Sequence, residues 1–214
     1  FVYMLGFSLA YLSLDAGAGA LILFGGVQIT MFTGALLGRE SVPTRRWVGA
    51  ALAFAGLLWL LWPSEAGGIA IMPALSMATA AVGWGVYSMA GRKGGDPLAG
   101  TAANFLLAAP LAVLALAVVP DVAAEIPATA AGIGLALVSG IVTSGLGYAL
   151  WYAILPQLGS TRAAVAQLTV PVIAAGGGLV LLAEPPTPRF LLASVLVLGG
   201  VLVATVPMRA GKSA

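Results

Sequence analysis

Long apolar runs separated by short polar segments are the dominant pattern of this chain of 214 residues. Seven of the eight runs that lack a charged residue are 18 residues or longer, and a helix needs about 20 mostly apolar residues to cross the hydrocarbon core of a bilayer. The runs are apolar on every face, which favours helices over the alternating strands of a barrel. Spans are predicted within residues 1–14, 16–38, 47–64, 66–91, 97–120, 126–161, 163–183 and 190–208.

These runs predict an all-α integral membrane protein, a polytopic helix bundle with seven complete spans and one partial span. The composition agrees, because apolar residues form 61% of the chain and charged residues 7%, whereas roughly a quarter of the residues of a soluble domain are charged. The chain has neither cysteine nor histidine, which removes thiolate chemistry, the usual general base and the commonest metal ligand. We therefore predict no catalytic residue, no metal and no cofactor. The net charge of +2 is too small to indicate a nucleic-acid partner.

The basic residues indicate how the bundle is oriented. If residues 126–161 form one helix, from about Ala128 to Pro156, eight basic residues lie on one side of the membrane and Arg189 alone lies on the other. Two helices in this run would give six against three. Cytoplasmic loops carry an excess of Lys and Arg, so the one-helix alternative is preferred. We expect a multi-pass protein of the cytoplasmic (inner) membrane with its C-terminus in the cytoplasm.

Several residues beside the predicted helix ends suit a structural role. Thr187, which is followed by a proline, has the pattern of an N-cap, and Ser160 and Thr161 can cap the helix that follows them. Glu40 and Glu184 lie at membrane boundaries beside helix starts. We interpret both glutamates as turn or cap residues, and a role in gating is the alternative.

The chain also resembles itself at an offset of 144 residues. Residues 40–63 align with residues 184–207 without a gap, and six of the 24 positions are identical. Chance and similar loop chemistry are the alternative explanation. The equivalent helices are five spans apart and therefore run in opposite directions, as in the inverted repeats of secondary transporters. The identical pairs of scarce residue types are Glu40/Glu184, Arg45/Arg189 and Pro63/Pro207.

This offset divides the chain into repeats. Residues 1–64 are interpreted as the C-terminal part of a first five-helix repeat, residues 66–208 as a second repeat and residues 209–214 as a cytoplasmic tail. Phe1 aligns with Gly145, so the first repeat is shorter than the second by about 78 residues. We expect inverted five-helix repeats with eight spans present of ten.

Three segments of the chain carry recognisable motifs, namely LLGRESVPTRRWVGAALAFAGLLWL, LLAEPPTPRFLLASVLVLGGVLVA and GYALWYAILPQLGSTRAAVAQLTVPVIAA. With these segments the chain resembles the EamA-type transporters of the drug/metabolite transporter superfamily. The first two resemble the family's Gly-Glu or Glu-Pro turn with the Gly-containing helix after it, and the third resembles its aromatic helix end, basic turn and Pro-Val helix. The resemblance implies ten helices in two repeats, with both termini in the cytoplasm. One difference is that Val27 occupies the position equivalent to Pro171.

Uncharged polar and aromatic side chains within the spans are the candidates for a substrate cavity, because no charge lies deep inside any span. Interhelical hydrogen bonding is the alternative role for the amides, and an interfacial belt is the alternative for the aromatic residues. Pro171 leaves carbonyl groups unpaired about one turn earlier, and such groups can line a cavity. The candidates are Gln28, Trp84, Tyr87, Asn104, Ser144, Tyr148, Gln167, Thr169 and Pro171.

Together these features predict a secondary active transporter that moves a small metabolite outward by alternating access between inverted repeats. Its predicted partners are the small-molecule substrate and the lipid bilayer. A membrane scaffold or assembly protein on the same fold, with no transport activity, is the alternative. The two differ in whether a solvent-accessible cavity reaches the middle of the bilayer.

Overall fold

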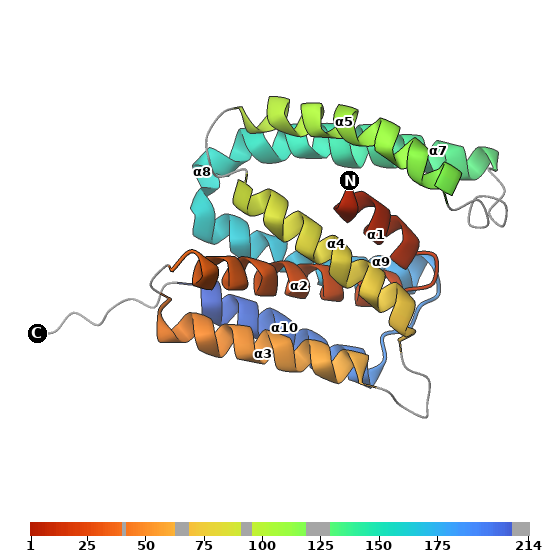
Figure 1. Ribbon diagram of the computed structural model, residues 1–214. Coiled ribbons are helices and arrows are strands. Elements are labelled where there is room, and N and C mark those ends of the chain that lie inside the picture. Colours follow the sequence, from red (N-terminus) through yellow and green to blue (C-terminus); the bar gives the residue numbers. More distant parts are fainter. Residues whose placement is uncertain (40–41, 63–68, 91–95, 119–128, 207–214) are drawn as a thin grey trace, which may run out of the picture. The chain divides into compact units, whose positions relative to one another are not determined.

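The computed structural model has only helices as regular elements among the residues that it describes, which confirms the all-α prediction. The chain divides into two compact units (Figure 1). The larger unit comprises residues 2–92 and 161–214, and the smaller unit comprises residues 93–160 with Phe1. The described residues are 1–39, 42–62, 69–90, 96–118 and 129–206, and the predicted cytoplasmic tail at 209–214 lies outside them.

The helices follow the apolar runs closely. Those of the larger unit are α1 (Val2–Ala10), α2 (Ala16–Leu37), α3 (Thr44–Leu61), α4 (Ile71–Ala90), α9 (Thr169–Leu181) and α10 (Pro188–Thr205). Those of the smaller unit are α5 (Pro97–Val118), α7 (Ala130–Val138), the π-helical segment η2 (Ser139–Leu146) and most of α8 (Gly147–Gln167). Four described stretches are long and apolar enough to cross a membrane, namely Ala16–Leu37, Pro97–Ala115, Ala130–Ile154 and Pro188–Thr205.

The run from α7 to α9 departs from the prediction at one point. The helix begins at Ala130 and is continuous through η2, as the one-helix alternative requires, but it does not end at Pro156. It continues to Gln167 and is interrupted at Leu168, so the predicted helix start at residues 160–161 is wrong. The reason lies with Pro171, which occupies the first turn of α9, where its missing N–H has no intrahelical partner to lose.

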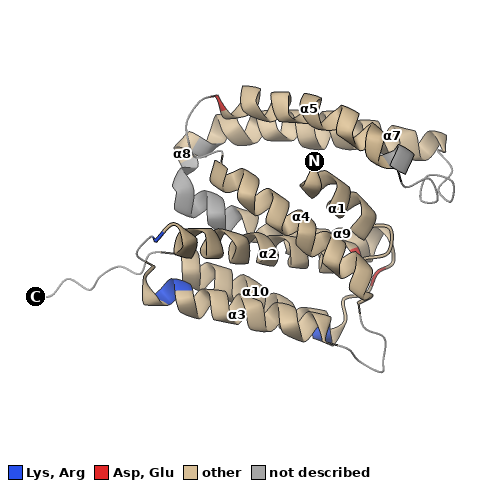
Figure 2. Ribbon diagram, viewed as in Figure 1, with Lys and Arg blue, Asp and Glu red and all other residues tan. Residues whose placement is uncertain are grey.

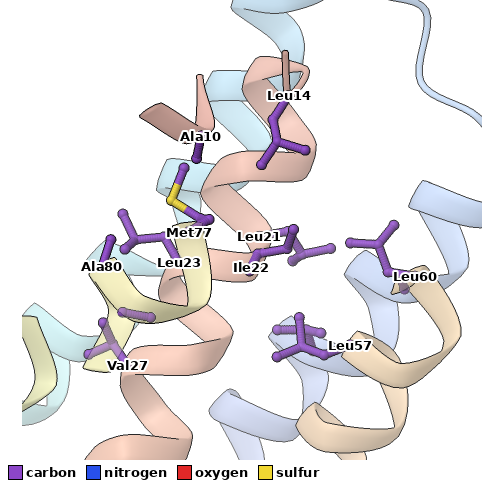
Figure 3. Close-up of a cluster of buried hydrophobic side chains, with 13 residues drawn as sticks. Ala10, Leu14, Leu21, Ile22, Leu23, Val27, Leu57, Leu60, Met77 and Ala80 are labelled. Carbon is purple, nitrogen blue, oxygen red and sulfur yellow. The ribbon is translucent and has the colours of Figure 1, made fainter. Parts of the chain in front are cut away.

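The core of the larger unit is built around α2. Leu21 and Ile22 of α2 and Met77 of α4 are at most 2% exposed. Figure 3 shows Met77 directed toward Ala10 of α1, while Leu57 of α3 lies on another side of the α2 residues. α2 is enclosed by α3, α4, α9 and α10, as its all-round apolar sequence requires.

Side chains of the smaller unit are mostly exposed. Leu106 of α5 is 77% exposed and Leu135 of α7 is 71% exposed. Thr101 of α5 is buried, and its hydroxyl lies 3.2 Å from the Tyr152 hydroxyl of α8. Apolar surface of this extent fits lipid, which is as apolar as a leucine side chain.

The charged side chains that the structure describes in the larger unit lie at the helix ends, as Figure 2 shows. Asp15 precedes α2, and Glu184 lies between α9 and α10. Arg39 follows α2 at its other end, and Arg45 lies in the first turn of α3. The middle of each of these helices is therefore free of formal charge.

Helices α3 and α10 form an antiparallel pair whose ends are joined by two reciprocal arginine contacts (Figure 1). Arg45, at the start of α3, donates to the carbonyl of Val206 at the end of α10, with Nη1 and O 2.5 Å apart. Arg189, at the start of α10, donates to the carbonyl of Trp62 at the end of α3. At the offset of 144 residues, Arg45 aligns with Arg189 and Trp62 aligns with Val206, so each contact is the counterpart of the other.

The middle of this pair has the same symmetry. A Cβ atom built on Gly56 would lie 2.9 Å from Leu196 Cβ, and one built on Gly200 would lie 3.0 Å from Leu52 Cβ. These two contacts also exchange under the offset of 144 residues. The helices approach closely at both glycines, which is the packing that small residues permit in membranes.

The C-terminal ends of α2 and α9, the helices that precede α3 and α10, correspond to each other as well. Arg39 and Ala183, which the offset superimposes, have positive φ angles of 53° and 57°. The amide of Gly38 donates to the carbonyl of Gly34 at 2.9 Å, and the equivalent amide of Leu182 donates to Gly178 at 3.0 Å. The likeness between the two segments thus extends to backbone conformation, beyond the residues that align by identity.

Candidate functional site

A cavity of about 320 Å³ opens at one end of the larger unit. Three connections meet there, those between α1 and α2, between α3 and α4, and between α9 and α10. The cavity combines ionic and hydroxyl groups with apolar walls, a composition suited to a small polar molecule. Its described lining residues are Ser13, Leu14, Asp15, Gly17, Ala18, Leu60, Ile69, Ala70, Ala175, Pro185, Pro186, Thr187, Arg189 and Phe190.

The start of α10 supplies the basic part of the lining. Thr187 is the N-cap, and its hydroxyl accepts a hydrogen bond of 3.1 Å from the amide of Phe190. This cap places Arg189 in the first turn, where its Nε donates to the carbonyl of Trp59 at 2.8 Å. The guanidinium is therefore held at the end of α3, beside the cavity that it lines.

The connection between α9 and α10 is fastened to the start of α2. A carboxylate oxygen of Glu184 accepts a hydrogen bond of 2.8 Å from the amide of Ala16, the first residue of α2. The amide of Glu184 itself donates to the carbonyl of Gly178 at 3.1 Å, through the left-handed backbone of Ala183. Glu184 is thus a cap residue, but the helix that it caps is distant in the sequence.

The predicted cavity residues of the larger unit occupy varied positions. Trp84 packs between Tyr3 and Phe24, with ring centroids 5.4 Å and 5.3 Å away, against the core cluster. The other residues range from Pro171, which is fully buried, to Thr169 and Tyr87, which are exposed. Gln28 of α2 and Gln167 at the end of α8 are half-buried.

The remaining predicted residues belong to the smaller unit. Asn104 is exposed on α5, and Ser144 lies half-buried in η2. The ring of Tyr148 stacks on that of Tyr152 at 5.9 Å and lies 6.2 Å from Phe105. Of all the predicted substrate residues, none is among the described residues that line the cavity, whereas the predicted cap Thr187 is. Glu40, predicted as a turn residue, lies outside the described residues.

Ser13, Asp15 and Arg189 were not among the site residues predicted from the sequence, because both charges lie at the ends of spans rather than inside them. Two signals could have found them. Asp15 directly precedes an apolar run, and Arg189 belongs to one of the repeat's identical pairs.

Residues 71–206 match the EamA-like transporter family. The chain is 45% identical over 214 residues to an uncharacterised protein of Pseudomonas aeruginosa, a match that covers all of this chain and 73% of that protein. It is 27% identical over 208 residues to an uncharacterised transporter of Archaeoglobus fulgidus, covering 94% of this chain and 72% of that protein. No solved structure matches the chain.

Proposed function

The chain belongs to the EamA-like transporter family, and from this premise we propose that it exports a small metabolite across the cytoplasmic membrane by alternating access. Membership of this family and the long apolar helices make it a multi-pass membrane protein and a transporter. The proposal adds the direction, the membrane, the class of cargo and the mechanism.

Alternating access is supported above all by the relation between α3 and α10. These helices are antiparallel, and each contact at one end of the pair has its counterpart at the other. Two inverted halves of this kind can exchange conformations, so that the site opens first to one side of the membrane and then to the other. The five-helix repeats predicted from the sequence are part of this proposal.

The cavity is proposed as the mouth of the transport pathway on the side away from the cytoplasm. Asp15 and Arg189 belong to the side that the positive-inside count places outside. The interior of the pathway is formed by uncharged candidates of the larger unit, among them Gln28 and Gln167. A neutral, polar interior suits uncharged or zwitterionic cargo better than a cargo of high net charge.

Flux measurements on the intact protein test the proposal. Proteoliposomes with the purified protein are loaded with radiolabelled compounds from a panel of amino acids, sugars, nucleosides and organic cations. When a proton or sodium gradient is imposed, we expect them to release at least one of these compounds faster than protein-free vesicles do. Gln28→Ala and Gln167→Ala should each reduce the initial rate severalfold. The matched control is Thr79→Ala, because the exposed Thr79 hydroxyl donates to the carbonyl of Leu75 within its own helix.

A folded protein with no gradient-linked flux across the whole panel would contradict transport and favour the scaffold alternative. An independent probe is a single cysteine at Gln167. The transport proposal requires that a water-soluble thiol reagent label this cysteine from at least one side of the membrane, whereas the scaffold alternative requires no labelling.

A further inference from the structure

We propose that Glu184 and Asp15 are alternative caps for one helix start, and that their exchange opens and closes the outer mouth. When the mouth is closed, Glu184 caps α2. When it opens, Glu184 leaves with the α9–α10 connection and Asp15 caps α2 instead, through the amide of Gly17 or Ala18, the second and third residues of the helix. This inference rests on the proposed transport function, because only a transporter needs the two states.

The first observation is the bond that holds the mouth closed. The Glu184 carboxylate lies 2.8 Å from the amide nitrogen of Ala16, although the residues are 168 positions apart. The start of a helix has unpaired N–H groups and a partial positive charge, so a carboxylate is a favourable partner. The bond ties α2 to the connection that carries the cavity residues Pro185 to Thr187.

The second observation concerns Asp15. It occupies the N-cap position of α2, with φ −60° and ψ 146°, the extended conformation that an N-cap residue adopts. Aspartate is among the best residues for that position. Yet, within the described part of the chain, its side chain makes no cap hydrogen bond and lines the cavity instead. Asp15 is therefore placed to cap α2 through the amide of Gly17 or Ala18, while the distant Glu184 carboxylate holds the amide of Ala16.

The third observation is that the closed contact is assembled under constraint. Ala183 has a φ of 57°, a conformation that costs energy in a residue with a side chain. A Cβ atom on Gly178 would lie 2.5 Å from the Glu184 carboxylate, so a glycine at this position lets the carboxylate lie beside Ala16 without moving aside.

The exchange explains how the mouth can open without leaving the helix start unpaired. Loss of an N-cap shifts a folding equilibrium by roughly fivefold on typical values. If Asp15 replaces Glu184, α2 keeps one cap in each state and the change between states costs less. Each carboxylate therefore stabilises one of the two states, which keeps the free-energy difference between them small.

Cysteine labelling tests the gate directly. A cysteine at Ala175, which lines the cavity beside Gly17, is labelled with a membrane-impermeant maleimide in the intact protein. We expect Glu184→Ala to raise the labelling rate about fivefold, because the closed state loses its cap, and Asp15→Ala to lower the rate, because the open state does. The matched control is Asp96→Ala, which removes an aspartate that caps α5 through the amides of Leu98 and Ala99 and should leave the rate unchanged.

A double-mutant cycle on unfolding in detergent tests the exchange of caps. Each single alanine variant should shift the unfolding equilibrium little, since the other carboxylate caps α2, whereas the double variant should shift it about fivefold more than the two single shifts together. Glu184→Gln, which keeps an acceptor oxygen, should lie between the wild type and Glu184→Ala in labelling rate.

Additive shifts, or a labelling rate that Glu184→Ala does not change, would overturn the proposal and leave Glu184 as a fixed structural cap. Failure of Glu184→Ala to fold would overturn it too, because Asp15 would then not have replaced it. Neither measurement uses a substrate, so a negative flux assay would contradict the proposed function without deciding the exchange of caps.

Discussion

Neighbouring glycines in this chain differ in the space around them. A Cβ atom added to Gly178 would meet the Glu184 carboxylate at 2.5 Å and Ala16 Cβ at 3.3 Å. One added to Gly177 or Gly176 would meet no atom within 4 Å among the described residues. The run of three glycines thus contains one position set by close packing, and the sequence alone assigns all three the same role.

Gly178→Ala should destabilise the protein by up to about 1 kcal/mol, because the new methyl group displaces the Glu184 carboxylate and crowds Ala16 Cβ, while Asp15 can still cap α2. Gly177→Ala, its neighbour in open space, should be neutral or stabilising by up to about 1 kcal/mol, since alanine is the better helix former. The free energy of unfolding in detergent measures both. Equal losses in the two variants would contradict the contact between Gly178 and Glu184.

Thr187→Ala should cost about 1 kcal/mol, because the amide of Phe190 loses the hydroxyl that caps α10. Thr33→Ala is a matched control, since the exposed Thr33 hydroxyl bonds only to the carbonyl of Ile29 within α2. The same unfolding measurement applies. A loss no larger than that of the control would show that the cap contributes nothing to stability.

Two elements, α3 and α10, have equal lengths and equivalent bounds. Residues 44–61 become residues 188–205 under the offset of 144, and arginine contacts close the pair at both ends. Their packing depends on glycines whose neighbours are main-chain atoms, which cannot move as a side chain can. The pair is therefore more sensitive to added volume than to loss of a surface group.

Gly200→Ala should destabilise the protein by about 1–3 kcal/mol, because its Cβ would lie 2.5 Å from the carbonyl oxygen of Gly49 and 2.7 Å from the amide of Ala53. Gly199→Ala, where the structure has no described atom within 4 Å, should be tolerated. Both are compared by unfolding in the same detergent. Tolerance of Gly200→Ala would contradict the close approach of α3 and α10.

At the scale of the whole molecule, the positive-inside count predicts which side each loop faces. Helix α2 has 22 residues and is about 33 Å long at 1.5 Å per residue, enough to cross the hydrocarbon core. Its two ends carry exposed residues of known position, Ser13 before the helix and Arg39 after it. The orientation can therefore be tested on one helix.

In intact cells, a cysteine at Ser13 should react with a membrane-impermeant maleimide. A cysteine at Arg39 should react only after the cells are permeabilised. Each single-cysteine variant is the control for the other, because both positions are exposed. The reverse pattern would contradict the predicted orientation, and reaction of both in intact cells would contradict a membrane-spanning α2.

The pattern of apolar residues was enough to predict the helical class and most helix bounds. These properties are local or periodic, because lipid demands about 20 apolar residues for each span and a cap pattern such as Thr187-Pro188 acts within one turn. Even the error at residues 160–161 was local, since both Pro156 and Pro171 were visible and only the context decided which interrupts the helix.

Tertiary structure alone decided which partner each of these residues has. Nothing in the sequence pairs Glu184 with Ala16, places Trp84 between Tyr3 and Phe24, or separates Gly178 from Gly177. These facts depend on distances between segments up to 168 residues apart, and composition and periodicity describe only which face of a helix is apolar. Lipid and protein interior are equally apolar, so the sequence identifies a span but not the neighbour against which it packs.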